Sequence, residues 1–375
     1  MRSLDQLYPT ARIDCRLKHI NNTSMTHRFP IKEIALQSGL STATIDRALN
    51  GRAHVSPQTQ ERVKAAISEL EAQEQQLSAR GRRLFVDIIV EAPQRFTSEV
   101  RAACEAVLTE TRSAVFRPRF HVFETLAEAE LLTLLHRIEK RGTQGICIKA
   151  RNAPAIQSEI DRLVARGLPI FTLVTDILPS QRLGYLGLNN QRAGQTAAYL
   201  MARSLVGQTG VILTTRSRDD FFGEAERHQG FLATLSDLRP DLRVIDVSGG
   251  GGLFSNTLGQ MTNVATTEEI LGVYSMGGGN RAILTELSRG ALRRPFFIAH
   301  DLDKENLSLL EAGQLDFVLY HDLRQDMRHL FHRFAAAHGL ARDHDTPYSS
   351  DIQVVTPFNI PRHGRASTGA QTPTL

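Results

Sequence analysis

From Phe85 onward the chain alternates short apolar segments with longer segments of helical periodicity, and this alternation restricts the possible folds more than any other feature. The β-rich apolar segments are FVDIIV, GICIKA, PIFTLV, GYLGL, GVILTT, RVIDVS, GVYSM, FFIAH and FVLYH. Segments such as SEIDRLVARG and NRAILTELSRG lie between them and have the spacing of amphipathic helices. This order predicts parallel sheets with helices on both faces.

The number of these segments predicts more than one sheet. About nine strands exceed what one compact sheet usually contains, so we expect two α/β lobes around a cleft. In such sheets, ligands bind beyond the carboxyl ends of the strands.

Composition is that of a globular intracellular protein. A chain of 375 residues with 41% hydrophobic residues has room for two or three ordinary domains. The formal net charge of +4 suits an anionic partner, but it also fits charges scattered over the surface. Cys15, Cys104 and Cys147 are widely spaced without a C-x-x-C pair, which argues against a disulfide framework or a thiolate metal site. No apolar run approaches the roughly 18 to 20 residues of a membrane helix, and the N-terminus lacks the apolar core of a secretory signal, so we expect a cytoplasmic protein.

The two ends of the chain have no clear periodicity. We expect residues 1–27 to be a disordered extension and residues 359–375 to be a disordered tail. Met25 directly precedes the organised region, so translation could also begin there.

Three short helices sharing one apolar core are predicted in residues 28–72. Gly39 supplies a turn, Ser41 is an expected N-cap, and Ser56 followed by Pro57 is an expected start of the third helix. The apolar positions of the three helices are Ile31, Ile34, Ala35, Leu40, Ile45, Ala48, Leu49, Val63, Ile67 and Leu70. This arrangement is typical of a helix-turn-helix module.

The outward face of the second helix presents Thr42, Ala43, Asp46, Arg47 and Asn50. Hydroxyl, methyl, guanidinium and amide groups near a helix N-terminus are suited to contact base edges in a DNA major groove. For a helix taken alone, a solvated polar face is the simpler interpretation.

The segment IKEIALQSGLSTATIDRALNGRAHVSPQTQERVKAAISEL resembles the DNA-binding head of the lactose-repressor (LacI) family over about 40 residues. The resemblance implies base contacts by Thr42, Ala43 and Arg47. It also places three further residues, Ser41, Thr44 and Asn50, near phosphates or in support of the helix. Asp46 stands where the family usually has serine, and it could accept from a cytosine amino group or orient Arg47.

The family pattern weakens after the third helix. Members usually continue as L-G-Y-x-P-N-x-x-A-R and form a hinge helix whose leucine enters the minor groove, whereas this chain has ELEAQEQQLSARGRRL. Leu77 lies at the matching distance and is the expected wedge. Residues 73–84 are therefore predicted to be a hinge, with a plain basic linker as the alternative.

The body, residues 85–358, is similar to the periplasmic sugar-binding-protein fold that serves the same family as effector and dimerisation domain. ERHQGF resembles the family's E-R-x-x-G-F and implies that Arg227 binds ligand oxygens. IAHDLD implies that Asp301 accepts from ligand hydroxyls, and LGLNN places Asn190 on the hinge side of the pocket.

Four further residues follow predicted strands where the family has ligand contacts: Phe96, Lys149, Asp176 and His321. Each could instead be an ordinary loop or surface residue.

Other chemically suggestive segments are better explained structurally. SGGGG and GGGN lack the spacing of phosphate-binding loops and are expected to form strand-end turns, with Asn280 as a helix cap or pocket donor. HDLRQDMRHLFH places Asp322, Asp326 and His329 on one helical face, which we interpret as a solvated charged face linked to arginines and not as a metal site. The chain also lacks a G-x-S-x-G elbow. We therefore expect no catalytic residue, no metal and no cofactor.

The sequence as a whole predicts an all-α helix-turn-helix head followed by a two-lobed, parallel-sheet α/β effector domain. The implied function is that of a transcriptional regulator, expected to be a repressor, which binds palindromic operator DNA as a homodimer or tetramer. A sugar or polyol is the expected effector, although the same fold also takes nucleobases and amino-acid-like ligands. The alternative is a cytoplasmic small-molecule-binding protein or an enzyme on the same scaffold, whose head makes protein contacts.

Overall fold

The computed structural model describes residues 29–52, 55–79, 82–111, 114–262, 269–289, 294–342 and 348–361, with the backbone alone for residues 72–79. The head, up to Arg82, and most of the chain from Arg83 onward are separate compact units, and each is described by itself. The predicted terminal extensions, including Met25, lie outside the described residues.

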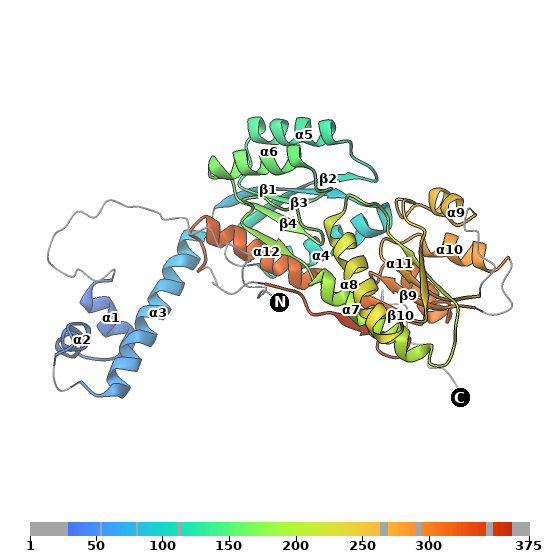
Figure 1. Cartoon of the computed structure of the whole chain (residues 1–375). Helices are drawn as coiled ribbons and strands as arrows, with labels where there is room; N and C mark the ends of the chain where they lie inside the picture. Colours follow the sequence, from blue (N-terminus) through green and yellow to red (C-terminus); the bar gives the residue numbers. More distant parts are fainter. Residues whose placement is uncertain are drawn as a thin grey trace, which may run out of the picture. The chain divides into compact units, whose positions relative to one another are not determined.

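The head contains the three predicted helices, α1 (Ile31–Ser38), α2 (Thr42–Leu49) and α3 (Pro57–Ala79) (Figure 1). Gly39 ends α1 in the left-handed conformation, with φ of 63°, which glycine adopts without steric cost. Ser41 caps α2, since its hydroxyl accepts a 3.1 Å hydrogen bond from the Thr44 amide. The helices enclose a small core of Phe29, Ile34, Ala35, Ile45 and Val63.

The third helix is longer than predicted. It begins at Pro57, with Ser56 Oγ accepting from the Thr59 amide at 3.2 Å, as the sequence indicates. It then continues through Ala79, so residues 73–79 of the predicted hinge extend α3. Leu77 lies on this last part of the helix, where side chains are outside the described part of the structure, and its minor-groove role stays a prediction.

The cap of α2 gives a first testable prediction. Replacing Ser41 with alanine leaves the Thr44 amide without its acceptor and should lower the free energy of unfolding of the head by about 1 kcal/mol. Urea denaturation followed by circular dichroism measures this change. Ser68→Ala, at an exposed position within α3, is the matched control and should be neutral or slightly stabilising; an equal loss in both variants would contradict the capping role.

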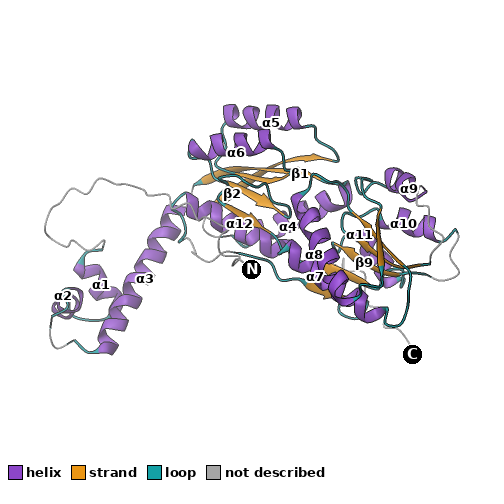
Figure 2. Ribbon diagram, in the orientation of Figure 1, coloured by secondary structure: helices purple, strands orange, loops and turns teal. Residues whose placement is uncertain are grey.

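The body consists of two α/β lobes, each with one sheet between two helical layers (Figure 2). In lobe 1 the strand order is β2-β1-β3-β4-β5, and the pairs from β1 to β5 that are described are parallel. Its strands are β1 (Arg83–Glu91), β2 (Val115–Phe123), β3 (Ile146–Lys149), β4 (Ile170–Leu173) and β5 (Gly184–Leu186).

The helices of lobe 1 cover both faces of its sheet. They are α4 (Gln94–Leu108), α5 (Glu128–Arg141), α6 (Pro154–Ala165) and α12 (Leu323–Ala337). Helices α5 and α6 pack Leu131, Leu135 and Ile160 against Ile148 on one face. On the other face, α12 packs beside α4 and brings Phe334 to 5.2 Å from the Phe171 ring.

Lobe 2 has the strand order β11-β10-β9-β8-β6-β7, in which only β11 is antiparallel to its neighbour among the described pairs. Its strands are β6 (Val211–Thr215), β7 (Arg243–Asp246), β8 (Ile270–Ser275), β9 (Phe296–His300), β10 (Phe317–Tyr320) and β11 (Gln353–Val355). Its helices are α7 (Asn190–Ser204), α8 (Phe222–Leu238), α9 (Phe254–Thr262), α10 (Asn280–Leu287) and α11 (Lys304–Glu311). Two buried clusters, one containing residues of α7 and α8 and the other residues of α9, α10 and α11, cover opposite faces of the sheet.

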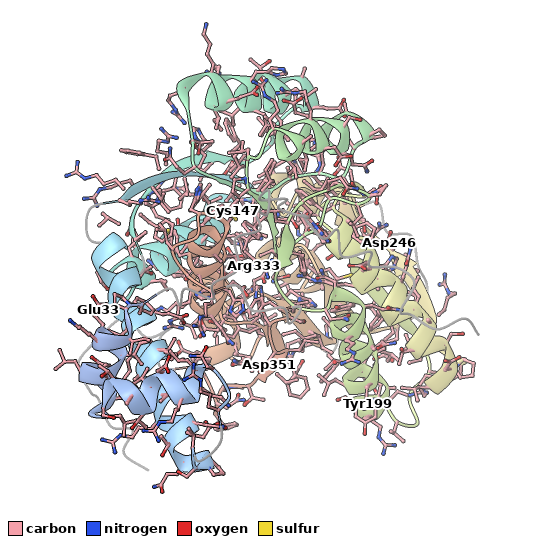
Figure 3. The ribbon with its side chains drawn as sticks, turned by 90° about the vertical axis from the view of Figure 1, so that its left-hand side faces the viewer. Glu33, Cys147, Tyr199, Asp246, Arg333 and Asp351 are labelled. Atoms are coloured by element: carbon pink, nitrogen blue, oxygen red, sulfur yellow. The ribbon has the colours of Figure 1, made fainter. Side chains whose placement is uncertain are left out.

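The two cysteines in the described residues lie in the interior of lobe 1. Cys147 of β3 is fully buried, while Tyr199 of α7 is 52% exposed at the periphery (Figure 3). Cys104 and Cys147 are free and buried, and burial raises the pKa of both thiols. Among the described helices, none is long and apolar enough to cross a membrane.

The chain passes between the lobes after β5, after β10 and before β11, and Asp326 connects two of these crossovers. Its carboxylate forms an ion pair with His321 (Nδ1 to Oδ2, 2.8 Å) and accepts hydrogen bonds from Tyr348 (2.9 Å) and Ser350. The Ser350 amide in turn donates to the Gly187 carbonyl at 2.9 Å, beside the first crossover. The fully buried Asp326 carboxylate therefore joins the second and third crossovers directly, and Ser350 joins them to the first.

This arrangement corrects the interpretation of HDLRQDMRHLFH as a solvated charged face. Asp326 is fully buried and His329 stacks on Tyr348 at 3.7 Å, while Asp322 caps α12 by accepting from the Arg324 amide at 2.9 Å. Within the described residues, no group of three or more His, Cys, Asp or Glu side chains could hold a metal ion.

Candidate functional site

The exposed face of α2 carries the residues predicted to contact DNA. Ser41, Thr42, Ala43, Arg47 and Asn50 are exposed, and Thr44 is half-buried. Arg47 Nε donates to the Ala43 carbonyl at 3.2 Å, which keeps the guanidinium on the helix face. Since Ile45 points into the core of the head, α2 presents hydroxyl, methyl and guanidinium groups outward.

Asp46 does not contact Arg47, so the hypothesis that it orients this arginine is wrong. Its carboxylate accepts from Asn50 Nδ2 at 2.8 Å and pairs with Arg52 at 3.2 Å. These contacts neutralise the acidic group locally and position Asn50 at the end of the helix. They also reduce the repulsion between Asp46 and a DNA phosphate.

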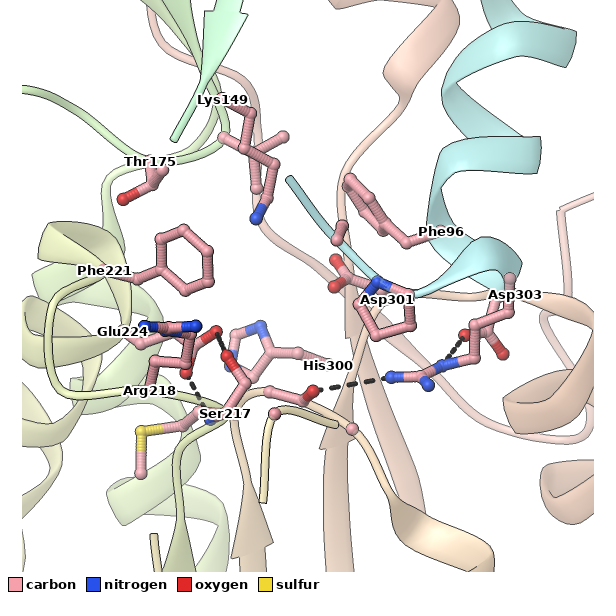
Figure 4. Close-up of a pocket in the computed structure, with 18 of the residues that line it drawn as sticks. Phe96, Lys149, Thr175, Ser217, Arg218, Phe221, Glu224, His300, Asp301 and Asp303 are labelled. Atoms are coloured by element: carbon pink, nitrogen blue, oxygen red, sulfur yellow. Dashed lines mark hydrogen bonds and ion pairs between the residues drawn. The ribbon is translucent and has the colours of Figure 1, made fainter. Parts of the chain in front are cut away.

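A cavity lies between the two lobes of the body, at the carboxyl ends of their parallel strands (Figure 4). It leaves about 60 Å³ for the centres of water-sized molecules, several times the roughly 10–15 Å³ that one water needs. A small polar molecule would fit this space. Lobe 1 contributes residues that follow β1 to β4, and lobe 2 contributes residues that follow β6 to β9.

Lys149, at the end of β3, points into the cavity between two aromatic rings (Figure 4). Its ammonium nitrogen lies 4.1 Å from the ring centre of Phe221 and 5.7 Å from that of Phe96. The same nitrogen donates to the Glu91 carbonyl at 3.0 Å. Burial lowers the pKa of Lys149, and the Glu224, Glu91 and Asp301 carboxylates oppose this shift.

Arg227, on the first half of α8, is the most buried guanidinium of the cavity, with 3% exposure. Its Nε donates to Asn190 Oδ1 at 2.7 Å and its Nη1 to the Met276 carbonyl at 3.2 Å. These bonds use two of the five guanidinium N–H donors and fix the orientation of the group.

The close packing of α7 against α8 sets this position. A Cβ at Gly194 would collide with the Arg227 carbonyl, and a Cβ at Gly230 would collide with the Gln191 carbonyl. Only glycine permits this approach of the two helix backbones. Asn190, the first residue of α7, is thereby brought to Arg227.

Two carboxylates face the two cations. Asp301 follows β9 with φ of 67°, an uncommon conformation for a residue other than glycine, and its side chain points into the cavity (Figure 4). Within the described structure, the Asp301 carboxylate makes no hydrogen bond or ion pair and is available to a ligand. Glu224 accepts from both the amide and the hydroxyl of Ser217 at 2.6 Å.

His300 is a neutral hydrogen-bonding group at the same wall. Its Nε2 lies 2.7 Å from the Tyr274 hydroxyl, and the residue is 3% exposed. Burial, followed by the positive charge of Arg227, lowers the pKa of His300 well below its ordinary value.

Four of the seven residues predicted to bind an effector line the cavity: Phe96, Lys149, Arg227 and Asp301. Asn190 positions Arg227 from behind. Asp176 pairs instead with Arg182, and His321 pairs with Asp326 at the crossover, so neither lines the cavity. Asn280 is buried, and its Nδ2 donates to Asn306 Oδ1 at 2.6 Å.

The structure adds lining residues that the sequence interpretation missed, among them Arg95, Thr125, Thr175, Ser217, Phe221, Glu224, His300 and Asp303. Most of them follow a strand directly or begin the next helix. Ligands bind beyond the carboxyl ends of the strands in parallel sheets, so these residues could have been predicted if the residues after every strand had been considered.

Family models match both units of the chain. Residues 88–328, well over half of the chain, match the periplasmic binding protein domain, and residues 30–71 match the bacterial regulatory proteins of the lacI family. Among curated protein sequences, none matches the chain significantly.

Solved structures share the fold of the body. A solute-binding protein from Burkholderia graminis in complex with D-arabinose has 19% identity and a TM-score of 0.67, over 74% of this chain and 97% of that one. An arabinose-binding protein from Geobacillus stearothermophilus has 22% identity and a TM-score of 0.60, over 76% and 99%. A proposed LacI transcriptional regulator from Bacteroides fragilis has 13% identity and a TM-score of 0.62, over 74% and 97%.

A helix-turn-helix head joined to a two-lobed body with a polar cavity defines the class of ligand-responsive DNA-binding regulators. The chain belongs to the LacI family of bacterial transcriptional regulators, with a periplasmic-binding-protein domain as its body.

Proposed function

We propose that this regulator is a cytoplasmic repressor that binds a palindromic operator as a homodimer and is controlled by a neutral monosaccharide or polyol. The charge distribution of the cavity carries the choice of ligand. Lys149 and Arg227 hydrogen-bond only to neutral groups within the described structure, and Glu224 does the same. The Asp301 carboxylate has no hydrogen-bond partner among the described residues. The cavity lining contains four cationic side chains (Arg95, Lys149, Arg218 and Arg227) and four carboxylates (Glu124, Glu224, Asp301 and Asp303), so a ligand without net charge fits best.

Hydroxyl groups suit such a site because each can donate to a carboxylate and accept from an ammonium or guanidinium group. Phe96 and Phe221 add apolar surface for the C–H faces of a sugar ring. The sugars in the solved neighbours support the same class, since two of those proteins bind arabinose according to their descriptions.

We propose that the cavity binds its ligand without converting it. Ser217 and Glu224 hydrogen-bond to each other, and His300 Nε2 is engaged by Tyr274. Neither pair is the serine–histidine or cysteine–histidine arrangement that commonly activates a nucleophile. Effector binding would change the lobe arrangement and thereby the operator affinity, by the coupling free energy between the two sites.

Arg47 tests the DNA-binding assignment. Arg47→Ala should lose about 1–3 kcal/mol of discrimination between operator and unrelated DNA, because the guanidinium fork is the group suited to guanine. Fluorescence anisotropy with promoter DNA from upstream of the protein's own coding sequence, at fixed salt, measures the change.

Arg47→Lys is the matched control for charge. Lysine keeps the attraction to phosphates but not the bidentate fork, so it should retain binding to unrelated DNA and lose discrimination. Sugar binding should be unaltered in both variants. Full operator discrimination by Arg47→Ala would show that α2 does not read the bases as proposed.

A further inference from the structure

Arg95 extends from lobe 1 into lobe 2 at one edge of the cavity. It lies at the start of α4, yet its three guanidinium nitrogens all contact lobe 2. Its Nε pairs with Asp303 Oδ2 at 2.7 Å, an interaction drawn as a dashed line in Figure 4. Its Nη1 donates to the Gly252 carbonyl at 3.0 Å, and its Nη2 lies 3.4 Å from the Gly277 carbonyl.

The receiving site in lobe 2 is shaped for this guanidinium. Asp303 is 3% exposed, and its second oxygen caps α11 by accepting from the Asn306 amide at 2.9 Å. Gly278 has φ of 86°, and a Cβ at this position would collide with the guanidinium of Arg95. The glycine-rich turn after β8 thus leaves room for a side chain from the opposite lobe.

Without Arg95, Asp303 would be a buried carboxylate lacking its only cationic partner within the described structure. Burial already raises the pKa of Asp303, and Arg95 opposes that shift. An unpaired buried charge is costly. While the lobes are together, Arg95 therefore neutralises a carboxylate that would otherwise be buried without a partner.

A second group of charges also joins the lobes. Arg151 of lobe 1 contacts Glu91 at 2.7 Å and Asp220 of lobe 2 at 3.4 Å. Arg218 of lobe 2 contacts Asp220 at 3.0 Å and Glu91 at 3.6 Å. The Asn152 amide donates to the Asp220 carbonyl at 2.8 Å. The inter-lobe contacts are thus made in large part by the protein's own charged groups.

We propose that the Arg95–Asp303 link holds the cleft closed before any effector binds, so that closure is an intrinsic state of the body. An effector then acts on a population that is already largely closed, and its entry requires the link to open. The strength of the link sets the fraction of open molecules, and with it the apparent affinity for the effector. This inference goes beyond the proposed function, because it concerns the body in the absence of both DNA and ligand.

Distance measurements between spin labels test the proposal directly. Glu128 of α5 and Ser255 of α9 are exposed, lie in different lobes, and can be changed to cysteine for labelling. Cys104 and Cys147 are buried, and Cys15 is replaced by serine in every variant. Double electron–electron resonance on the full chain, without DNA or sugar, gives the distribution of inter-lobe distances.

Arg95→Ala should broaden this distribution and lengthen its mean by more than about 2 Å, the range of a true lobe rearrangement. Asp303→Asn should give the same result, because asparagine keeps the cap of α11 but removes the charge. The double variant should open no further than either single variant, since both remove one link.

Arg101→Ala is the matched control from the same helix. Arg101 lies over the Phe120 ring of its own lobe at 4.2 Å and makes no described contact with lobe 2, so its removal should leave the distances unchanged. An unaltered distribution in both Arg95→Ala and Asp303→Asn, with native circular dichroism, would overturn the proposal. Because neither operator nor effector enters the measurement, its failure is distinct from failure of the proposed function.

Discussion

Replacing Arg227 with methionine is expected to weaken effector binding by about 10²-fold or more. Arg227 is buried, and it is held by Asn190 and the Met276 carbonyl with its remaining donors available to the cavity. Removing a buried charged donor from a bound ligand costs about 2–5 kcal/mol, which is the source of the expected loss. Methionine retains much of the apolar volume, so the effect isolates the hydrogen-bonding head.

Isothermal titration calorimetry with the sugar that alters operator binding measures this change. Arg192→Met is the matched control, because Arg192 is an exposed arginine near the start of α7. The Arg227 variant should still bind operator DNA but should no longer respond to the sugar. Unchanged sugar affinity in Arg227→Met would remove this residue from the proposed site.

Replacing Asp326 with asparagine is expected to lower the free energy of unfolding of the body by about 3 kcal/mol. Asp326 is fully buried, and it is the acceptor for Tyr348 and Ser350 and the counter-ion of His321. Breaking a buried pair leaves the remaining partner uncompensated, which is more costly than losing an exposed one. Urea unfolding measures this loss. Asp322→Asn is the matched control: asparagine retains the cap of α12, so the free energy of unfolding should change little.

The pH dependence of this difference follows from the two pKa shifts. Burial alone would lower the pKa of His321, but Asp326 raises it above its ordinary 6.5; burial alone would raise the pKa of Asp326, but His321 lowers it below 3.8. The stabilisation is fully present between these two ordinary values. It is lost as pH rises through the raised pKa of His321 or falls through the lowered pKa of Asp326. The difference between wild type and Asp326→Asn should therefore be largest near pH 5 and shrink above neutrality; a constant difference would contradict the ion pair.

Much of the fold could be predicted from the sequence because the continuous apolar segments are the strands that are buried between helical layers. The nine apolar segments all correspond to strands of the two sheets. β2 was missed because VFRPRFHVF interleaves basic residues and contains Pro118, a pattern that an edge strand tolerates. β11 is a three-residue antiparallel edge strand, too short for any periodicity.

The site was predictable where a motif fixes a position and not where two lobes must meet. Arg227 was predicted from a helix-start motif and Asp301 from a strand-end motif, and both line the cavity. His321 also follows a strand. However, it forms an ion pair with Asp326 on the next helix, and this pair places its side chain at the crossover and not in the cavity. Arg95 gave no sequence signal, since its partners come from loops more than 150 residues away, at Gly252 and beyond.

The central claim is that the head recognises a specific DNA sequence and that a small ligand of the body controls this recognition. The most direct test is salt-titrated binding of the full chain to its own upstream promoter DNA, with unrelated DNA as control and a panel of pentoses, hexoses and polyols added afterwards. We predict binding to a palindrome at least about 10³-fold tighter than to unrelated DNA, changed at least about 5-fold by one compound of the panel. Equal and equally salt-sensitive binding to both DNAs, unaffected by every compound, would contradict the account.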